Sequence, residues 1–188
     1  MGTNKLLLPF AGGTVLGHIL DVLSRSDLEG IYAVLGYQAQ LVTRQIADYP
    51  VTIVHNNDYQ ADMLSSIRCG LAALPLNCDK ILLVLGDQPN ITTVLINQII
   101  LASNTTDKKI LVPLYQGRHG HPLLFSTFFR PEIMTTFDDV GLRGLLARHS
   151  HDVFELNVSS PAVLSDMDYP DDYRRELEFL NTTPTNAE

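Results

Sequence analysis

The segment Lys80–Pro89, with the sequence KILLVLGDQP, constrains the fold of this chain most strongly. Its apolar run Ile81–Leu85 has the length of a strand, and a strand without polar positions is expected to be buried on both faces. Gly86 ends the run and allows a close turn, and Asp87 is the first charged group after it. Proteins with open parallel sheets bind their ligands in a crevice just beyond the carboxyl ends of the strands, so we expect Asp87 in an active-site crevice. The alternative is that Asp87 only caps a helix beginning near Thr92.

Apolar runs of strand length alternate with segments of helical periodicity through the first two thirds of the chain. The expected strands are Ile31–Leu35, Val51–Val54, Ile81–Leu85, Ile110–Leu114, Leu123–Phe125 and Val153–Val158, with a short extended segment at Val163–Asp168. The first expected helix follows Thr14, and the last one starts at Pro170. Between them, helices are expected at Gln38–Ala47, around Met63–Leu74, and at Thr92–Ser103, Ser126–Phe137 and Gly141–Arg148. This alternation predicts an α/β fold whose mostly parallel sheet carries helices on both faces.

Size and composition place the chain among single-domain proteins. Its 188 residues predict one domain over residues 1–180, followed by a polar, disordered tail at Asn181–Glu188. A formal charge of −8 argues against nucleic-acid binding through phosphates. Cys69 and Cys78 lie outside metal-ligand spacing, and we expect Cys69 in a helix core and no disulfide. No signal peptide or membrane-length apolar run occurs, which predicts a cytoplasmic protein without membrane contact.

A second group of carboxylates occupies Asp166–Asp172. Asp171 and Asp172 fall in the first turn of the last expected helix, where they complement its dipole. Asp168 lies before that helix, and it either caps the helix or faces Asp87 across the crevice. Two converging carboxylates with no basic residue beside either are costly unless a cation joins them. A phosphate ligand together with so few oxygen donors would suit Mg²⁺.

Short motifs occur in a fixed order along the chain: KLLLP from Lys5, HNNDY from His55 followed by Ser65 and Ser66, GDQP from Gly86, GHPLLF from Gly120 and DMDYPDD from Asp166. Each is weak alone, but the ordered set resembles the MobA-like nucleotidyltransferases, and among them the molybdenum cofactor cytidylyltransferases. The resemblance covers nearly everything except the C-terminal tail. It implies a Rossmann-like three-layer sandwich of the nucleotide-diphospho-sugar transferase type.

The resemblance also implies an activity and its ligands. The implied reaction is Mg²⁺-dependent, transfers CMP from CTP to the molybdopterin phosphate and releases pyrophosphate. The product would be a dinucleotide cofactor for molybdenum hydroxylases. The implied partners are therefore Mg²⁺, a nucleotide, a molybdopterin-type small molecule and a molybdenum hydroxylase apoprotein.

Carried over by motif, the resemblance implies three catalytic residues: Asp87 and Asp168 as Mg²⁺ ligands, and Lys5 as a contact of the nucleotide phosphates. The implied nucleotide-binding residues are Lys5, Ser65, Ser66, Gly86 and Asp87, with the serines near the base. The implied residues on the acceptor side are Gln88, Pro89, Gly120, His121 and Pro122. Other polar residues are read as structural, with His119 and Arg143 on the surface and His149 and His151 beside a helix end.

The chain departs from the family ahead of KLLLP. The resemblance implies a first strand and a glycine-rich loop there, whereas Met1–Lys5 resembles only the end of that signature. Without the strand, Ile31–Leu35 and Ile81–Leu85 would stand about 10 Å apart with unpaired edges. We expect either that the native chain begins before Met1, or that Lys5–Phe10 fills the slot and Ala11–Gly13 forms a phosphate loop. Pro9 counts against a central strand, because it cannot donate to the ladder.

Two rival functions stay open at this stage. One is a catalytically impaired protein that binds molybdopterin and delivers it to a molybdenum hydroxylase, which the missing loop favours. The other is a nucleotidyltransferase that acts on a different phosphorylated acceptor.

Overall fold

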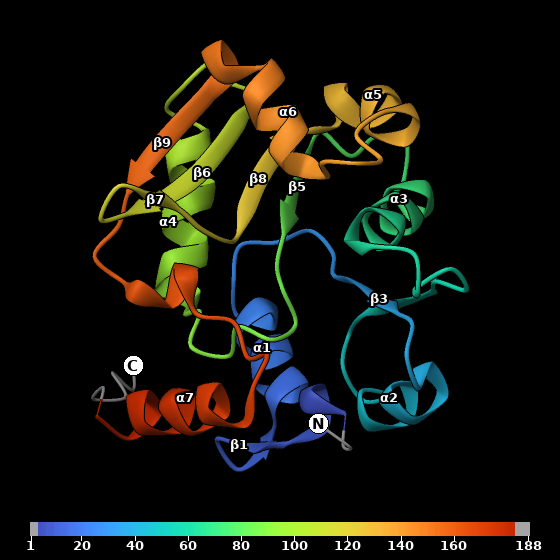
Figure 1. Cartoon of the computed structure of the whole chain (residues 1–188), viewed down its shortest axis with the longest axis vertical. Helices are drawn as coiled ribbons and strands as arrows, with labels where there is room; N and C mark the ends of the chain where they lie inside the picture. The colour runs from blue at the N-terminus through green and yellow to red at the C-terminus, as the bar shows by residue number, and fades with distance from the viewer. Residues whose placement is uncertain (1–3, 183–188) are drawn as a thin grey trace.

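Residues 4–182 are described in the computed structural model of the chain (Figure 1). The strands are β1 Pro9–Phe10, β2 Gly13–Thr14, β3 Tyr32–Leu35, β4 Thr52–His55, β5 Lys80–Leu83, β6 Ile110–Tyr115, β7 Arg118–His119, β8 Leu123–Ser126 and β9 Val153–Asn157. The α-helices are α1 Val15–Ser24, α2 Ala39–Gln45, α3 Met63–Ala73, α4 Thr93–Ser103, α5 Arg130–Thr135, α6 Leu142–Arg148 and α7 Pro170–Thr182. Short 3₁₀ helices are η1 Lys5–Leu7, η2 Thr127–Phe129, η3 Ser150–Asp152 and η4 Pro161–Leu164.

The main sheet is mixed, which corrects the expectation of a mostly parallel sheet. Its strand order is β5-β8-β6-β7, and β9 also pairs with β6. Strand β8 runs antiparallel to both β5 and β6, whereas β9 runs parallel to β6. The cause is the length of the link between Tyr115 and Leu123, which is too short for the crossover that a parallel pair requires.

Helices cover both faces of this sheet, as the sequence predicts. Side chains alternate along β8, so that Leu124 belongs to one buried cluster while Leu123 and Phe125 belong to another. The first cluster contains side chains of α1 and α4, and the second contains side chains of α3, α5 and α6. Figure 1 shows α4 behind β6. The three-layer α/β architecture is therefore confirmed.

Strands β3 and β4 form a separate parallel pair beside the main sheet. Among residues 4–182, no strand joins β3 to β5, and β5 ends the main sheet. Both faces of this run pack against buried clusters, Leu82 against the first and Ile81 and Leu83 against the second, but all three side chains are only half-buried.

The prediction that Lys5–Phe10 fills the slot as a strand is also wrong. Lys5–Leu7 forms η1, and Pro9–Phe10 pairs antiparallel with Gly13–Thr14 in a small hairpin. Ala11 and Gly12 have positive φ angles and form the hairpin turn, so they are not a loop between a sheet strand and α1. Leu6–Leu8 packs against the first buried cluster instead of entering the sheet.

Helix boundaries follow local sequence signals closely. The Thr14 side chain caps α1 by accepting from the Gly17 amide, and α7 begins at Pro170 as predicted. Two boundaries are corrected: the expected helix at Ser126–Phe137 divides into η2 and α5, and η4 occupies the start of the segment expected to be extended. Helix α7 continues through Asn181 and Thr182, and the rest of the expected tail lies outside the described residues.

Both cysteines are free and half-exposed, so Cys69 is not a core residue. None of the helices in the described part of the chain has the length and apolar character needed to cross a bilayer.

The link between β7 and β8 packs directly on η4 and leaves no room for a side chain at Gly120. The Gly120 amide donates to the Pro113 carbonyl at 2.9 Å, and the His121 amide donates to the Val163 carbonyl at 2.8 Å. A Cβ atom at Gly120 would lie 2.3 Å from that Val163 carbonyl oxygen. The loop that carries His121 is therefore held against the segment that leads to Asp168.

We expect Gly120→Ala to lower the free energy of unfolding by about 1–3 kcal/mol, because the obstructing atoms are backbone and the core must shift. Urea denaturation measures this loss. Gly30→Ala is the matched control, since its Cβ would meet Tyr32 Cε2 at 3.7 Å, an ordinary contact. Its free energy of unfolding should change by at most about 0.5 kcal/mol. Equal stability of the two variants would contradict the close packing at Gly120.

Candidate active site

Two carboxylates from distant parts of the chain meet at one ammonium group. Lys5 Nζ lies 2.7 Å from Asp87 Oδ2 and 3.0 Å from Asp168 Oδ1. Asp87 follows the end of β5, and Asp168 comes just before α7, so the two motifs converge as the sequence predicts. No basic residue adjoins either carboxylate in the sequence, and the positive charge comes from Lys5, which contacts both.

The helix η1 brings Lys5 to this position. Asn4 begins η1, and its side chain accepts a hydrogen bond from the Leu6 amide at 3.1 Å. The Leu6 side chain lies over Gly86, where an added Cβ would be 3.4 Å from Leu6 Cδ2. The Leu6 side chain of η1 therefore packs on the loop that carries Asp87.

Neither carboxylate of the pair caps the helix that follows it. Thr92 caps α4, with its hydroxyl accepting from the Leu95 amide at 3.2 Å, so the capping alternative for Asp87 is excluded. At α7, Asp172 Oδ2 accepts from the amides of Asp168 and Tyr169 at 3.0 and 2.7 Å. Asp172 thereby holds the Asp168 backbone on α7 and leaves the Asp168 carboxylate available to Lys5.

The hydrogen bonds at this helix start also affect the pKa of Asp172. The bond from the Tyr169 amide lowers the pKa of the Asp172 carboxyl, desolvation opposes it, and the Asp168 amide and the charges of Arg175 and Lys5 lower it further. Asp172 therefore stays ionised at neutral pH and keeps its two acceptor bonds.

Lys5 is a protonated cation under neutral conditions. Burial acts to lower the pKa of the Lys5 ammonium, but its hydrogen bonds and charge interactions with Asp87 and Asp168 outweigh burial and raise the pKa overall. The side chains of Lys5, Asp87 and Asp168 are 32%, 20% and 62% exposed. An ion pair as solvated as Lys5–Asp168 contributes only about 0.2–1 kcal/mol, so it cannot alone fix Asp168 in place.

Two buried polar atoms beside the pair have no hydrogen-bond partner among the described residues: Gln88 Oε1 and His121 Nδ1. The His121 ring bonds the Leu83 carbonyl and is near Asp87 and Asp166, and His121–Pro122 is a cis peptide. Burial lowers the pKa of His121 against the opposing effects of these three neighbours. A neutral ring that donates to Leu83 leaves Nδ1 as an acceptor. Buried unpaired acceptors are uncommon, and here they suit a ligand that carries N–H groups.

The expected nucleotide-binding serines belong to a different group of contacts. Asn56 Nδ2 donates to Ser65 Oγ and Ser66 Oγ, both at 3.0 Å, in the first turn of α3. No hydrogen bond connects either serine with the Lys5 group within residues 4–182. Asn56 is only 6% exposed, and its place in the HNNDY motif is the only sequence signal that points to it.

The carboxylate pair fits a small divalent cation. The described residues contain no group of three or more His, Cys, Asp or Glu arranged for a metal, so the protein would supply Asp87 and Asp168 alone. Mg²⁺ is commonly held in this way, by one or two carboxylates together with substrate phosphates and water. The position of the Lys5 ammonium between both carboxylates shows that positive charge is favourable there.

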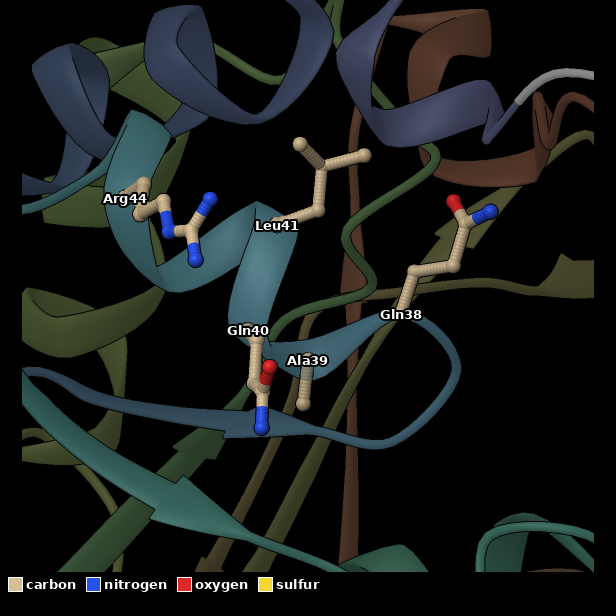
Figure 2. A pocket seen from close by; sticks show the side chains of 5 residues that line it. All are labelled: Gln38, Ala39, Gln40, Leu41 and Arg44. Carbon is tan, nitrogen blue, oxygen red and sulfur yellow. The ribbon is translucent and has the colours of Figure 1, made fainter.

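A shallow depression of about 460 Å³ lies over α2, and Figure 2 shows its lining residues Gln38, Ala39, Gln40, Leu41 and Arg44. It includes none of Lys5, Asp87 and Asp168. A single charged side chain offers little chemistry for group transfer. We therefore assign the candidate active site to the carboxylate pair and not to this depression.

An α/β fold with two carboxylates and a lysine meeting at one point is compatible with nucleotidyl transfer, and comparison with known families gives the class. A family model described as the MobA-like NTP transferase domain matches residues 1–153. The chain belongs to this family, which confirms the resemblance drawn from the motifs.

Individual relatives extend this family assignment. Molybdenum cofactor cytidylyltransferase from Escherichia coli K12 is 29% identical over 177 residues, covering 92% of this chain and 86% of the relative. Nicotine blue oxidoreductase from Paenarthrobacter nicotinovorans is 27% identical over 172 residues, covering 87% and 83%. The crystal structure of Rv0371c from Mycobacterium tuberculosis in complex with manganese superposes with a TM-score of 0.80 at 34% identity, covering 93% and 91%.

Replacing Lys5 tests whether its ammonium competes with a divalent cation. We expect Lys5→Met to bind Mn²⁺ about tenfold more tightly in the absence of nucleotide, because a positive charge in contact with both carboxylates is removed. Calorimetric titration of Mn²⁺ into nucleotide-free protein measures the affinity. Lys108→Met is the control, since this lysine bonds the His151 carbonyl away from the pair. An unchanged or weaker Mn²⁺ affinity of Lys5→Met would contradict this competition.

Proposed function

We propose that this protein is a Mg²⁺-dependent nucleotidyltransferase that transfers CMP from CTP to a molybdopterin-type acceptor and releases pyrophosphate. The observation that carries the proposal is the convergence of Lys5, Asp87 and Asp168 from widely separated parts of the chain. Membership of the MobA-like family supports nucleotidyl transfer. The likeness to molybdenum cofactor cytidylyltransferase supports the choice of CTP and of a molybdopterin acceptor.

The chain's own residues suit this chemistry. In the proposal Asp87 and Asp168 hold the cation, which when bound neutralises phosphate charge. Lys5 releases the carboxylates and donates to the phosphate oxygens, where charge develops during transfer. The attacking group is a phosphate that is already ionised near neutral pH, so no strong general base is required.

The acceptor side is proposed to lie at Gln88, Pro89 and the Gly120–Pro122 turn. Gln88 Oε1 and His121 Nδ1 are both acceptors without partners among the described residues. A pterin ring carries several N–H donors, which match such acceptors. Ser65 and Ser66 stay proposed as contacts of the nucleotide near its base.

The second candidate is a molybdopterin-binding protein that delivers the cofactor to a molybdenum hydroxylase. The start of α1 favours it, because the Val15 amide donates to the Leu8 carbonyl at 3.0 Å and the Gly17 amide donates to Thr14 Oγ1 at 3.1 Å. Amides engaged in this way are not available to cradle a triphosphate as a glycine-rich loop does. A third candidate keeps nucleotidyl transfer but uses another phosphorylated acceptor.

We expect Asp87→Asn and Asp168→Asn each to lower the rate of pyrophosphate release from CTP and molybdopterin at least about 100-fold, because each removes a charged ligand of the cation. The unfolding midpoint should stay near that of the unchanged protein, since both side chains contact solvent. Asp171→Asn, on the exposed surface of α7, is the control. Equal pyrophosphate release by all four proteins would rule out the proposed mechanism.

Calorimetric titration and the pyrophosphate-release assay together separate the three candidates. We expect CTP to bind only together with Mg²⁺, and GTP to bind more weakly. Tight molybdopterin binding without any effect of CTP or Mg²⁺ would favour delivery over transfer. Pyrophosphate release with a different phosphorylated acceptor, and none with molybdopterin, would favour the third candidate.

A further inference from the structure

A buried polar contact joins the loop after Asp87 to the helix after Asp168. Asn90 Nδ2 donates to Glu176 Oε2 at 2.7 Å and to the Glu176 main-chain carbonyl at 3.1 Å. Asn90 and Glu176 are 8% and 6% exposed. Gln88, in the same loop, is also buried. Buried polar groups are therefore concentrated where this loop meets α7.

The burial of Glu176 makes this contact important to the position of α7. A carboxyl group removed from water needs a hydrogen-bond donor, and the Asn90 amide supplies one. Burial raises the pKa of Glu176, and the bond from Asn90 and the charge of Arg175 oppose this rise, while Asp172 and Asp166 add to it. Without Asn90, the Glu176 carboxyl would lose its donor, so the bond favours one seating of the helix on the loop.

The contact is linked to both carboxylates of the active site by short stretches of ordered backbone. Asn90 comes three residues after Asp87, at the end of the GDQP turn. Glu176 lies one helical turn after Asp172, whose carboxylate accepts from the Asp168 amide at 3.0 Å. The Asn90–Glu176 bond and α7 thus connect Asp87 with Asp168 through the protein itself.

A second contact limits the movement of α7 in the same region. The Tyr173 hydroxyl donates to the Pro9 carbonyl of β1, and Figure 1 shows α7 alongside β1. The direct link through Lys5 is weaker, because Asp168 is largely exposed and solvated ion pairs contribute little. The buried bond is therefore better placed than Lys5 to set the separation of the two carboxylates.

We propose that Asn90 and Glu176 are positioning residues, whose hydrogen bond holds Asp168 beside Asp87 so that the pair can bind a divalent cation. This inference rests on the proposed function, in which the pair holds the cation. It assigns no contact with the cation or the substrate to either residue.

The test is titration of Mn²⁺ into nucleotide-free protein, with free Mn²⁺ followed by electron paramagnetic resonance. We expect Asn90→Ala to weaken Mn²⁺ binding about tenfold, a loss typical of residues that support metal ligands. Glu176→Met removes the side-chain acceptor of the Asn90 amide but keeps the main-chain carbonyl and a similar volume, and it should weaken Mn²⁺ binding about threefold. Glu176→Gln keeps an oxygen that can accept from Asn90, and its affinity should stay within about twofold of the unchanged protein.

Two further measurements separate positioning from a general loss of structure. Asp171→Ala, on the exposed side of the same helix, should leave Mn²⁺ affinity unchanged. In the transfer assay, Asn90→Ala should raise the Mg²⁺ concentration needed for half-maximal rate, while the rate at saturating Mg²⁺ approaches that of the unchanged protein. If Asn90→Ala does not fold, the comparison of Glu176→Met with Glu176→Gln decides the matter.

The outcomes distinguish this inference from the proposed function. Mn²⁺ binding that Asp87→Asn abolishes, but that Asn90→Ala and Glu176→Met leave intact, would overturn the positioning role alone. Mn²⁺ binding that does not depend on Asp87 would overturn both. Equal losses in Glu176→Met and Glu176→Gln would also overturn the positioning role, because only the first removes the acceptor.

Discussion

The structure of the site depends on the repulsion between two carboxylates, which must be offset by positive charge. Asp87 and Asp168 come within about 3 Å of the same ammonium nitrogen, and without it two like charges would face each other across a partly dry space. Three neighbouring elements help to bring the two carboxylates and Lys5 together. Leu6 of η1 packs beside Gly86, Asp172 holds the start of α7, and Thr92 caps α4, so that neither carboxylate is used as a helix cap.

The mixed sheet brings three segments of the chain together around the site. The β7–β8 link returns along β6, so β8 lies between β6 and β5 and brings the Gly120–Pro122 turn near the end of β5. There the His121 ring bonds the Leu83 carbonyl while its backbone amide bonds Val163. The GDQP turn, the Gly120–Pro122 turn and the segment before α7 thus border one region. A sheet with only parallel neighbours would not place these three motifs together in this way.

Features set by local sequence could be predicted well, whereas features set by packing could not. Thr14 and Pro170 mark helix starts by their own chemistry, and the apolar runs predict most strands. The positions of Asp87 and Asp168 at element ends allowed either helix capping or convergence, and only the family resemblance favoured convergence. By contrast, KLLLP has the composition of a strand, but Pro9 and contacts with the core make it η1 and a hairpin. The bond between Asn90 and Glu176 has no local signal, because its partners are 86 positions apart in the sequence.

Lys5, Asp87 and Asp168 lie far apart in the sequence, and this separation determines which segments must be docked before the site can form. Their contacts span 82 and 163 positions, so the site exists only when η1 and the start of α7 are both docked beside the loop that follows β5. Peripheral elements open locally at a lower free-energy cost than the core. A bound ligand would then slow the local opening of η1 and α7, and protease protection or amide exchange would register this before any change in the melting of the core.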